Sequence, residues 1–217
     1  MLANFFSKSK PVNFILIIVL FFIYYVLENF IYRSVAINLD VLVVVPLYLG
    51  VFFLYNFIIA KNRLTKDDSY AFLLFVVGLG CLPQLKMAYI VLIEYVFLLL
   101  FLRRIYSLRT LKSIYEKLFD SGLWLGVLFL VSPEYVFYLF LLFAAVLLFI
   151  KLTFRTVVIP LLGFLTPVFL FFTYHFYLDT LGAFYQLFDI EFTLDFSIYN
   201  SSFYVVSLLA FGLVTLV

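Results

Sequence analysis

Residues 157–178 read VVIPLLGFLTPVFLFFTYHFYL, an apolar stretch without a single Asp, Glu, Lys or Arg. A helix needs about 20 such residues, with roughly 17 as the lower limit, to cross a hydrocarbon layer of about 30 Å. The whole chain of 217 residues has the same character, because 67% of it is hydrophobic and only 12% is charged. A soluble domain is only about half apolar. We therefore predict an integral membrane protein.

The rest of the chain contains further stretches of this kind, so we expect an all-α, polytopic transmembrane bundle of about eight spans. Spans three and four, and spans five and six, are predicted to form two short helical hairpins, which need thinning, tilt or partners to match a bilayer. The last span is still apolar where the sequence stops, so we expect a single transmembrane domain over 1–217 that is truncated at its C-terminus. The predicted spans are 11–32, 41–60, 69–85, 88–102, 118–132, 135–150, 157–178 and from 203 onward.

The basic residues predict the orientation, because Lys and Arg accumulate on the cytoplasmic side of membrane proteins. If the N-terminus is cytoplasmic, only Arg33 and Lys86 lie outside. The other twelve lie inside: Lys8, Lys10, Lys61, Arg63, Lys66, Arg103, Arg104, Arg109, Lys112, Lys117, Lys151 and Arg155.

Acidic residues gather toward the opposite, outer ends of the spans and give the catalytic candidates Glu28, Asp40 and Glu94. An ionisable group at membrane depth costs several kcal/mol and usually faces the bundle interior or a water-filled cavity. Glu94 is the deepest of the three. The alternative is that it pairs with a buried hydroxyl, with Lys86 or with a partner subunit. His175 is the only histidine, so we expect a hydrogen-bonded or interfacial side chain and no metal site.

The stretch 103–120 combines apolar residues at helical spacing with basic residues. This pattern predicts a cytoplasmic amphipathic helix whose charges contact anionic headgroups. The alternatives are an ordinary positive-inside loop, or a site for a phosphate-bearing lipid or a cytoplasmic partner. The residues predicted to contact lipid phosphates or headgroups are Arg103, Arg104, Arg109 and Lys112.

The predicted external loop 179–202 contains a strict alternation of apolar and polar residues from 188 to 198. Period two is the signature of a strand, and an extended strand must pair or lie at the interface because its backbone groups cannot face lipid. The alternative is an irregular interfacial loop. The apolar residues predicted to dock a protein partner are Phe188, Ile190, Phe192, Leu194 and Phe196.

Two further patterns concern helix packing. Gly122 and Gly126 have the GxxxG-like spacing that lets two membrane helices approach closely. Pro160, Gly163 and Pro167 indicate a kinked or broken helix.

No phosphate-binding loop, dinucleotide fingerprint or nucleophile elbow occurs in the sequence, and we expect no cofactor and no nucleic-acid partner. The leading hypothesis is a non-catalytic membrane subunit or scaffold of a cell-envelope complex, which binds the bilayer and membrane protein partners. A third hypothesis is a proton-coupled transporter with Glu94 as its proton or substrate site.

Three stretches, 62–71, 103–108 and 117–124, resemble a family of bacterial polytopic membrane proteins of unassigned function from gliding and related envelope-rich gram-negative bacteria. This resemblance implies a multi-pass protein of the bacterial inner membrane. A looser, fold-level resemblance to glycosyltransferases and polysaccharide polymerases that use lipid-linked sugars gives the second hypothesis, a transferase or polymerase of that kind. It implies Glu28 or Asp40 as the catalytic acid or base. It also implies a polyprenyl-phosphate lipid as partner. The short loop 33–40 departs from the long first external loop of those enzymes.

Overall fold

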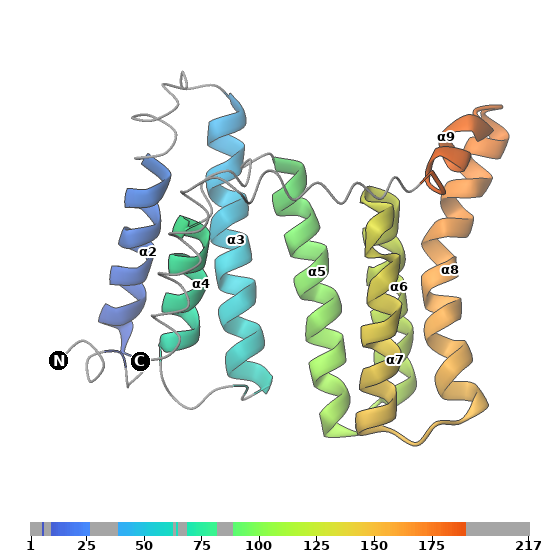
Figure 1. The fold of residues 1–217 in the computed structure, drawn as a ribbon, viewed down its shortest axis with the longest axis horizontal. Helices are drawn as coiled ribbons and strands as arrows, with labels where there is room; N and C mark the ends of the chain where they lie inside the picture. Colours follow the sequence, from blue (N-terminus) through green and yellow to red (C-terminus); the bar gives the residue numbers. More distant parts are fainter. Residues whose placement is uncertain are drawn as a thin grey trace, which may run out of the picture. The chain divides into compact units, whose positions relative to one another are not determined.

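The computed structural model describes residues 6, 10–26, 39–62, 64, 69–81 and 89–189. All regular elements in these ranges are helical (Figure 1), which confirms the all-α expectation for this part of the chain. The chain forms two compact units. Unit one comprises 1–45, 63–88 and 193–217, and unit two comprises 46–62 and 89–192. The expectation of one transmembrane domain stays a prediction.

Unit one contains α2 (Pro11–Val26), the first residues of α3 (Leu39–Asn62), and α4 (Tyr70–Cys81). Helix α2 begins at the proline where the sequence predicts it, since proline has no N–H and its fixed φ suits a first helical turn. Helices α2 and α4 contact each other, and the rings of Phe14 and Phe72 lie 5.3 Å apart between centroids.

Unit two holds the remainder of α3 and the better part of the described structure. Helix α6 packs against both α5 and α8, and the three helices run alongside one another (Figure 1). The elements in chain order are α5 (Tyr89–Ser107), the 3₁₀ turn η2 (Leu108–Thr110), α6 (Ile114–Val131), the 3₁₀ turn η3 (Pro133–Phe137), α7 (Tyr138–Phe149), α8 (Phe154–Tyr177) and α9 (Leu181–Gln186).

The core of unit two is apolar and is shared by α5, η2, α6 and α7. Its buried members come from all four elements, so each element contributes to the core. They are Phe101, Ile105, Leu108, Leu118, Leu125, Leu128, Leu142, Ala145 and Val146.

The contact between α6 and α8 is made by glycines. A Cβ added to Gly122 would clash with the carbonyl oxygen of Pro160, and one added to Gly126 would clash with that of Phe164. A Cβ on Gly163 would meet a carbonyl oxygen of α6 in the same way. The two backbones therefore touch directly, as the GxxxG-like spacing predicts.

Helix α8 is continuous through Pro160 and Pro167, so of the predicted kinked or broken helix the broken alternative is wrong. It starts with a capping box, in which the Thr153 hydroxyl accepts from the backbone N–H of Thr156 (3.3 Å). The Thr156 hydroxyl accepts from the backbone N–H of Thr153 (2.8 Å). These two bonds satisfy donors that a helix start otherwise leaves open.

Two of the described helices are long and apolar enough to cross a membrane: 43–62 within α3, and α8. Two shorter apolar helices cover 11–23 and 133–149. Length and composition thus mark membrane-crossing candidates among the predicted spans, although fewer than the eight expected.

The prediction of a single amphipathic helix over 103–120 is wrong, because the chain reverses direction within this stretch. Helix α5 ends at Ser107, η2 follows, and α6 begins at Ile114. The chain turns at Leu111 (φ 52°) and Ser113 (φ 47°), both in the left-handed region. The physical reason is burial: Leu108 is fully covered inside unit two, whereas a helix lying flat on a membrane surface would leave it in the headgroups.

Candidate functional site

The hairpin of α5 and α6 has a group of polar side chains at each end. Because the two helices are antiparallel, the start of α5 lies beside the end of α6, and the end of α5 beside the start of α6. We call the group at the first end the carboxylate cluster (Glu94, Ser132 and Tyr135). We call the group at the second end the basic corner; it comprises Arg104, Ser107, Thr110, Lys117 and Asp120.

The carboxylate cluster surrounds Glu94, which lies in the second turn of α5 and is half-buried. The Ser132 hydroxyl donates to Glu94 Oε1 at 2.6 Å, and the Tyr135 hydroxyl donates to Oε2 at 3.3 Å. Ser132 follows the last residue of α6 in an extended conformation, and Pro133 then starts η3. This turn brings both hydroxyls over the same carboxylate.

The two hydroxyls confirm the alternative in which Glu94 pairs with hydroxyl groups. A hydrogen bond to an ionised group is roughly twice as strong as a neutral one. Both carboxylate oxygens accept a bond within the chain, and no described Lys or Arg makes an ion pair with Glu94. The arrangement joins three elements, α5, the end of α6 and η3, through one side chain.

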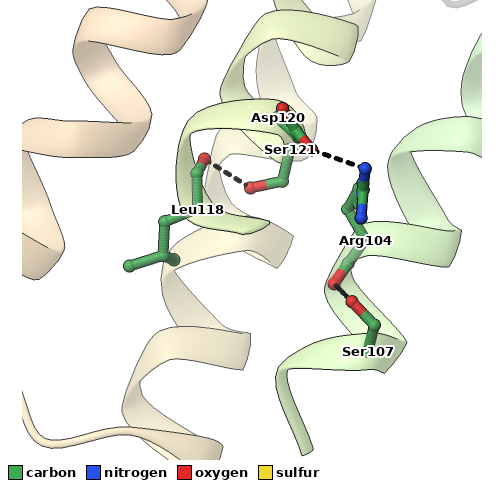
Figure 2. A network of polar contacts seen from close by, with 5 residues as sticks. All are labelled: Arg104, Ser107, Leu118, Asp120 and Ser121. Atoms are coloured by element: carbon green, nitrogen blue, oxygen red, sulfur yellow. Dashed lines mark hydrogen bonds and ion pairs between the residues drawn. The ribbon is translucent and has the colours of Figure 1, made fainter. Parts of the chain in front are cut away.

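Figure 2 shows part of the basic corner. Arg104 Nη2 lies 2.6 Å from Asp120 Oδ2, which ties the last turns of α5 to the first turns of α6. The Ser107 hydroxyl donates to the Arg104 carbonyl at 2.8 Å, and the Ser121 hydroxyl donates to the Leu118 carbonyl at 2.8 Å. Both serines thus satisfy their polar groups on their own helices.

Lys117 closes the corner from the other side. Its Nζ donates to the Ser107 carbonyl and to the Thr110 hydroxyl, both at 2.7 Å. Partial burial lowers the pKa of the Lys117 ammonium, and the neighbouring charges of Arg104 and Lys112 lower this pKa further. The last carbonyls of a helix have no backbone N–H donor within the helix, and the Lys117 ammonium supplies a donor to the carbonyl of Ser107, the last residue of α5.

The four predicted headgroup residues have different surroundings. The Arg103 guanidinium lies 5.0 Å from the centroid of the Phe57 ring, a cation–π distance, and Arg104 is paired with Asp120. Arg109 and Lys112 are exposed at the corner. The structure therefore leaves Arg109 and Lys112 as the two best placed to contact lipid headgroups.

Several predicted site residues lie outside the described residues: Glu28, the side chain of Asp40, and Ile190, Phe192, Leu194 and Phe196. Phe188 lies in the turn that follows α9, and its ring centroid is 5.4 Å from that of Phe184 and 6.2 Å from that of Phe129. The strand over 188–198 therefore stays a prediction.

His175 is hydrogen-bonded, as predicted. Its Nδ1 lies 2.8 Å from the Thr180 hydroxyl, and its ring centroid lies 4.3 Å from that of Phe171. In the described part of the chain no three His, Cys, Asp or Glu residues gather into a group that could hold a metal ion. The contacts explain His175 as a link between the end of α8 and the turn before α9.

One hollow of about 470 Å³ opens on the side of α8, bordered by α9. Its lining is apolar except for Thr166, and it does not reach the carboxylate cluster.

Comparisons with models of protein families, with curated proteins and with solved structures found no match. The resemblances drawn from the sequence therefore stay predictions.

The sequence analysis did not predict the partners of Glu94 and of Arg104, although their distances along the sequence from the hairpin turn indicate them. In an antiparallel hairpin, facing residues are equally far from the turn. Arg104 and Asp120 are each eight residues from Lys112, and Glu94 and Ser132 are each nineteen from Ser113. A hairpin turn placed at 112–113 would have predicted both pairs.

Proposed function

We propose that the chain is a multi-spanning protein of the bacterial inner membrane with about eight spans and a cytoplasmic N-terminus. We further propose that it acts as a non-catalytic subunit or scaffold of a cell-envelope complex. The membrane location is supported by the charge distribution and by exposed apolar surface. The scaffold role is supported by helices that are too short for the bilayer and by polar groups engaged within the chain.

The charge distribution separates the two ends of unit two. All basic residues described in this unit lie near the end formed by the last turns of α3 and α5 and the first turns of α6 and α8. Four of the six acids described in this unit (Glu94, Glu134, Asp179 and Asp189) lie toward the opposite end, whereas Glu116 and Asp120 lie at the basic end. This separation is what the positive-inside rule produces in a bilayer. The basic residues are Lys61, Arg103, Arg104, Arg109, Lys112, Lys117, Lys151 and Arg155.

The long helices expose apolar surface. Only 28% of the membrane-crossing window in α3, and 28% of that in α8, is buried within the chain. The core helix of a soluble protein would be mostly buried. From Arg155 to His175 the axis of α8 rises about 30 Å, which matches the hydrocarbon thickness. Lipid is the solvent that such a helix fits.

The observation that carries the scaffold proposal is the outward face of α7. Phe140 is 77% exposed, Leu147 64% and Leu148 78%. Together with η3, α7 forms an apolar helix of 17 residues (5 in η3 and 12 in α7), whose axis covers about 28 Å, slightly less than a hydrocarbon layer of about 30 Å. A short apolar helix reduces this mismatch by associating with neighbours. We therefore assign the protein-docking surface to Phe140, Leu147 and Leu148.

The engagement of the polar groups also favours a structural role. Glu94 accepts two hydrogen bonds within the chain, and Arg104 is paired with Asp120. A catalytic acid or base needs a contact with its substrate. In the described residues these groups instead hold helices together.

The test is site-specific photo-crosslinking in the native membrane. A photo-crosslinking amino acid at Phe140 should give a discrete adduct with one protein, identified by mass spectrometry after gentle-detergent purification. The same amino acid at Val12, a 55% exposed position on α2, serves as the matched control and should give none. A chain that purifies as a monomer and yields no protein adduct at Phe140 contradicts the scaffold proposal. Bound polyprenyl-phosphate lipid on such a monomer would favour the transferase instead.

A further inference from the structure

The last turn of α8 exposes two tyrosines. Tyr174 is 61% exposed and Tyr177 is 85% exposed. The two residues are three positions apart, so they are neighbours on one face of the helix. Within the described part of the chain neither hydroxyl has a hydrogen-bond partner. Both side chains therefore offer a ring and a free hydroxyl to the surroundings.

The chain itself covers another side of this helix end. Helix α9 packs against α8 (Figure 1), and the rings of Phe184 and Phe172 lie 5.1 Å apart between centroids. His175 is held by the chain as well, through the Thr180 hydroxyl and the Phe171 ring. The two tyrosines are left to face whatever surrounds the protein.

The surface of α8 changes from apolar to polar at these tyrosines. Before them Phe169 is 62% exposed and Leu170 63%. After them Asp179 and Thr180 are exposed. Tyrosine combines an apolar ring with a polar hydroxyl, and it is enriched where the hydrocarbon of a membrane meets water. The order of apolar residues, tyrosines and polar residues is that of a helix leaving a bilayer.

The distance to the other end of α8 matches a bilayer. Arg155 is exposed in the first turn of the helix. Tyr174 and Tyr177 follow about 28 Å and about 33 Å further along the axis, and the hydrocarbon layer is about 30 Å thick. With Arg155 at the inner boundary of this layer, the two tyrosines lie at the outer boundary.

We propose that Tyr174 and Tyr177 bind the headgroup layer of the outer leaflet and thereby fix the depth of α8 in the bilayer. Their rings contact the ends of the acyl chains next to the headgroups, and their hydroxyls donate to headgroup oxygens. A neutral hydroxyl needs no charged partner, so zwitterionic and anionic phospholipids both suit this surface. The proposal rests on the membrane insertion proposed above.

A tryptophan reporter measures the depth of this surface. The only tryptophan, Trp124, is replaced by Phe, which keeps a ring against Phe97, and Tyr177→Trp introduces the reporter. The full chain is reconstituted into phosphatidylcholine vesicles whose acyl chains carry bromine either near the headgroup or near the methyl end. Bromine near the headgroup should quench the reporter more strongly. Depth is read from the nearer surface, so both orientations in the vesicle give the same result.

Phe169→Trp in the same background is the matched control. Phe169 is exposed on the same helix and lies about 12 Å before Tyr177 along the axis. The order of quenching should be reversed there, because this position lies well inside the hydrocarbon layer.

Variants of the two tyrosines test the anchoring itself. With the reporter at Phe169→Trp, the double substitution Tyr174→Ala with Tyr177→Ala should let the end of α8 sink, which shifts the quenching further toward bromine near the methyl end. Tyr174→Phe with Tyr177→Phe keeps both rings and should shift it less. An unchanged depth in the double Ala variant contradicts the anchoring.

The remaining outcomes contradict the proposal in distinguishable ways. A Tyr177→Trp reporter quenched mainly by bromine near the methyl end lies inside the hydrocarbon, which overturns the contact with headgroups. A reporter quenched by aqueous iodide and by neither bromine projects into water, which also overturns it. Both results leave membrane insertion intact. A Phe169→Trp protein that no bromine quenches and that fails to float with the vesicles overturns membrane insertion and the proposal together.

Discussion

Helix α6 packs against its two neighbours by opposite means. Toward α8 it presents Gly122 and Gly126, so backbone meets backbone and no atom can be added. Toward α5 it presents large side chains, among them Trp124, whose ring stacks on Phe97 with centroids 5.9 Å apart. Among the described residues, the polar contacts on the α5 side lie at its two ends.

For a unit that crosses the bilayer as proposed, the difference shows what can hold helices together in lipid. Burying apolar side chains gains little there, because lipid is as apolar as leucine, and close packing and hydrogen bonds contribute instead. The α8 side combines the close packing of the glycines with the Phe129 ring of α6, whose centroid lies 5.5 Å from that of Phe164 in α8. The α5 side combines the packing of large apolar side chains with the carboxylate cluster and the basic corner. We therefore expect the α8 side to be sensitive to added volume and the α5 side to lost hydrogen bonds.

The largest effect should come from filling the glycine contact. The double substitution Gly122→Ala with Gly126→Ala forces α6 and α8 apart and should destabilise unit two by about 3 kcal/mol or more, since each overpacked site costs about 1–3 kcal/mol. Unfolding by sodium dodecyl sulfate in mixed micelles measures the change.

Gly50→Ala is the matched control, because nothing lies within 4 Å of a Cβ at that position in α3. It should leave stability unchanged or raise it by up to about 1 kcal/mol through helix propensity. Equal effects of the two sets of variants would contradict the backbone contact between α6 and α8.

The next effect should come from Ser132→Ala, which removes the 2.6 Å donor to Glu94 Oε1. A half-buried carboxylate oxygen left without its donor should cost about 2 kcal/mol. Tyr135→Phe, which removes the longer 3.3 Å bond, should cost less. The same unfolding assay ranks the two variants, and a larger effect of Tyr135→Phe would contradict the geometry of the cluster.

The ion pair of Arg104 and Asp120 should matter less, because the two side chains are 34% and 33% exposed. Asp120→Asn should cost about 0.5 kcal/mol, as partly exposed pairs do. Exchanging both residues, Arg104→Asp with Asp120→Arg, should restore most of the loss. Failure of the exchange to restore stability would show that the pair is not what the two positions contribute.

The smallest effect should be a pH dependence from Lys117. Its pKa is lower in the folded chain than the usual 10.5, so the folded state gives up this proton at a lower pH than the unfolded state. Stability should therefore rise as the pH increases from the folded pKa toward 10.5. The comparison with Lys117→Arg, which does not titrate in this range, isolates the effect. A relative loss of stability over the same window would contradict it.

The helical fold was readable from the sequence, but the corner was not. Long apolar runs and Pro11 mark helices by composition and by backbone chemistry. Over 103–120 the apolar spacing continues across the turn, and no glycine or proline interrupts it. The turn is instead made by Leu111 and Ser113 in left-handed conformations, which these residue types rarely adopt.

The candidate site was readable in part for a similar reason. Glu94 stood out because a carboxylate among apolar residues is costly in a membrane. Its partners Ser132 and Tyr135 did not stand out, because serine and tyrosine are common and cost little at such positions. Only the register of the hairpin brings them to Glu94, and the register depends on where the corner lies.

The central claim is that unit two crosses the bilayer with its basic end in the cytoplasm, and cysteine labelling tests it most directly. Cys81, the only cysteine, is changed to Ser, and Lys112→Cys and Asp189→Cys are made separately. In intact spheroplasts a membrane-impermeant maleimide should label the Asp189→Cys protein at once and the Lys112→Cys protein only after permeabilisation. Labelling of both proteins in intact spheroplasts, or of the Lys112→Cys protein alone, would contradict the account.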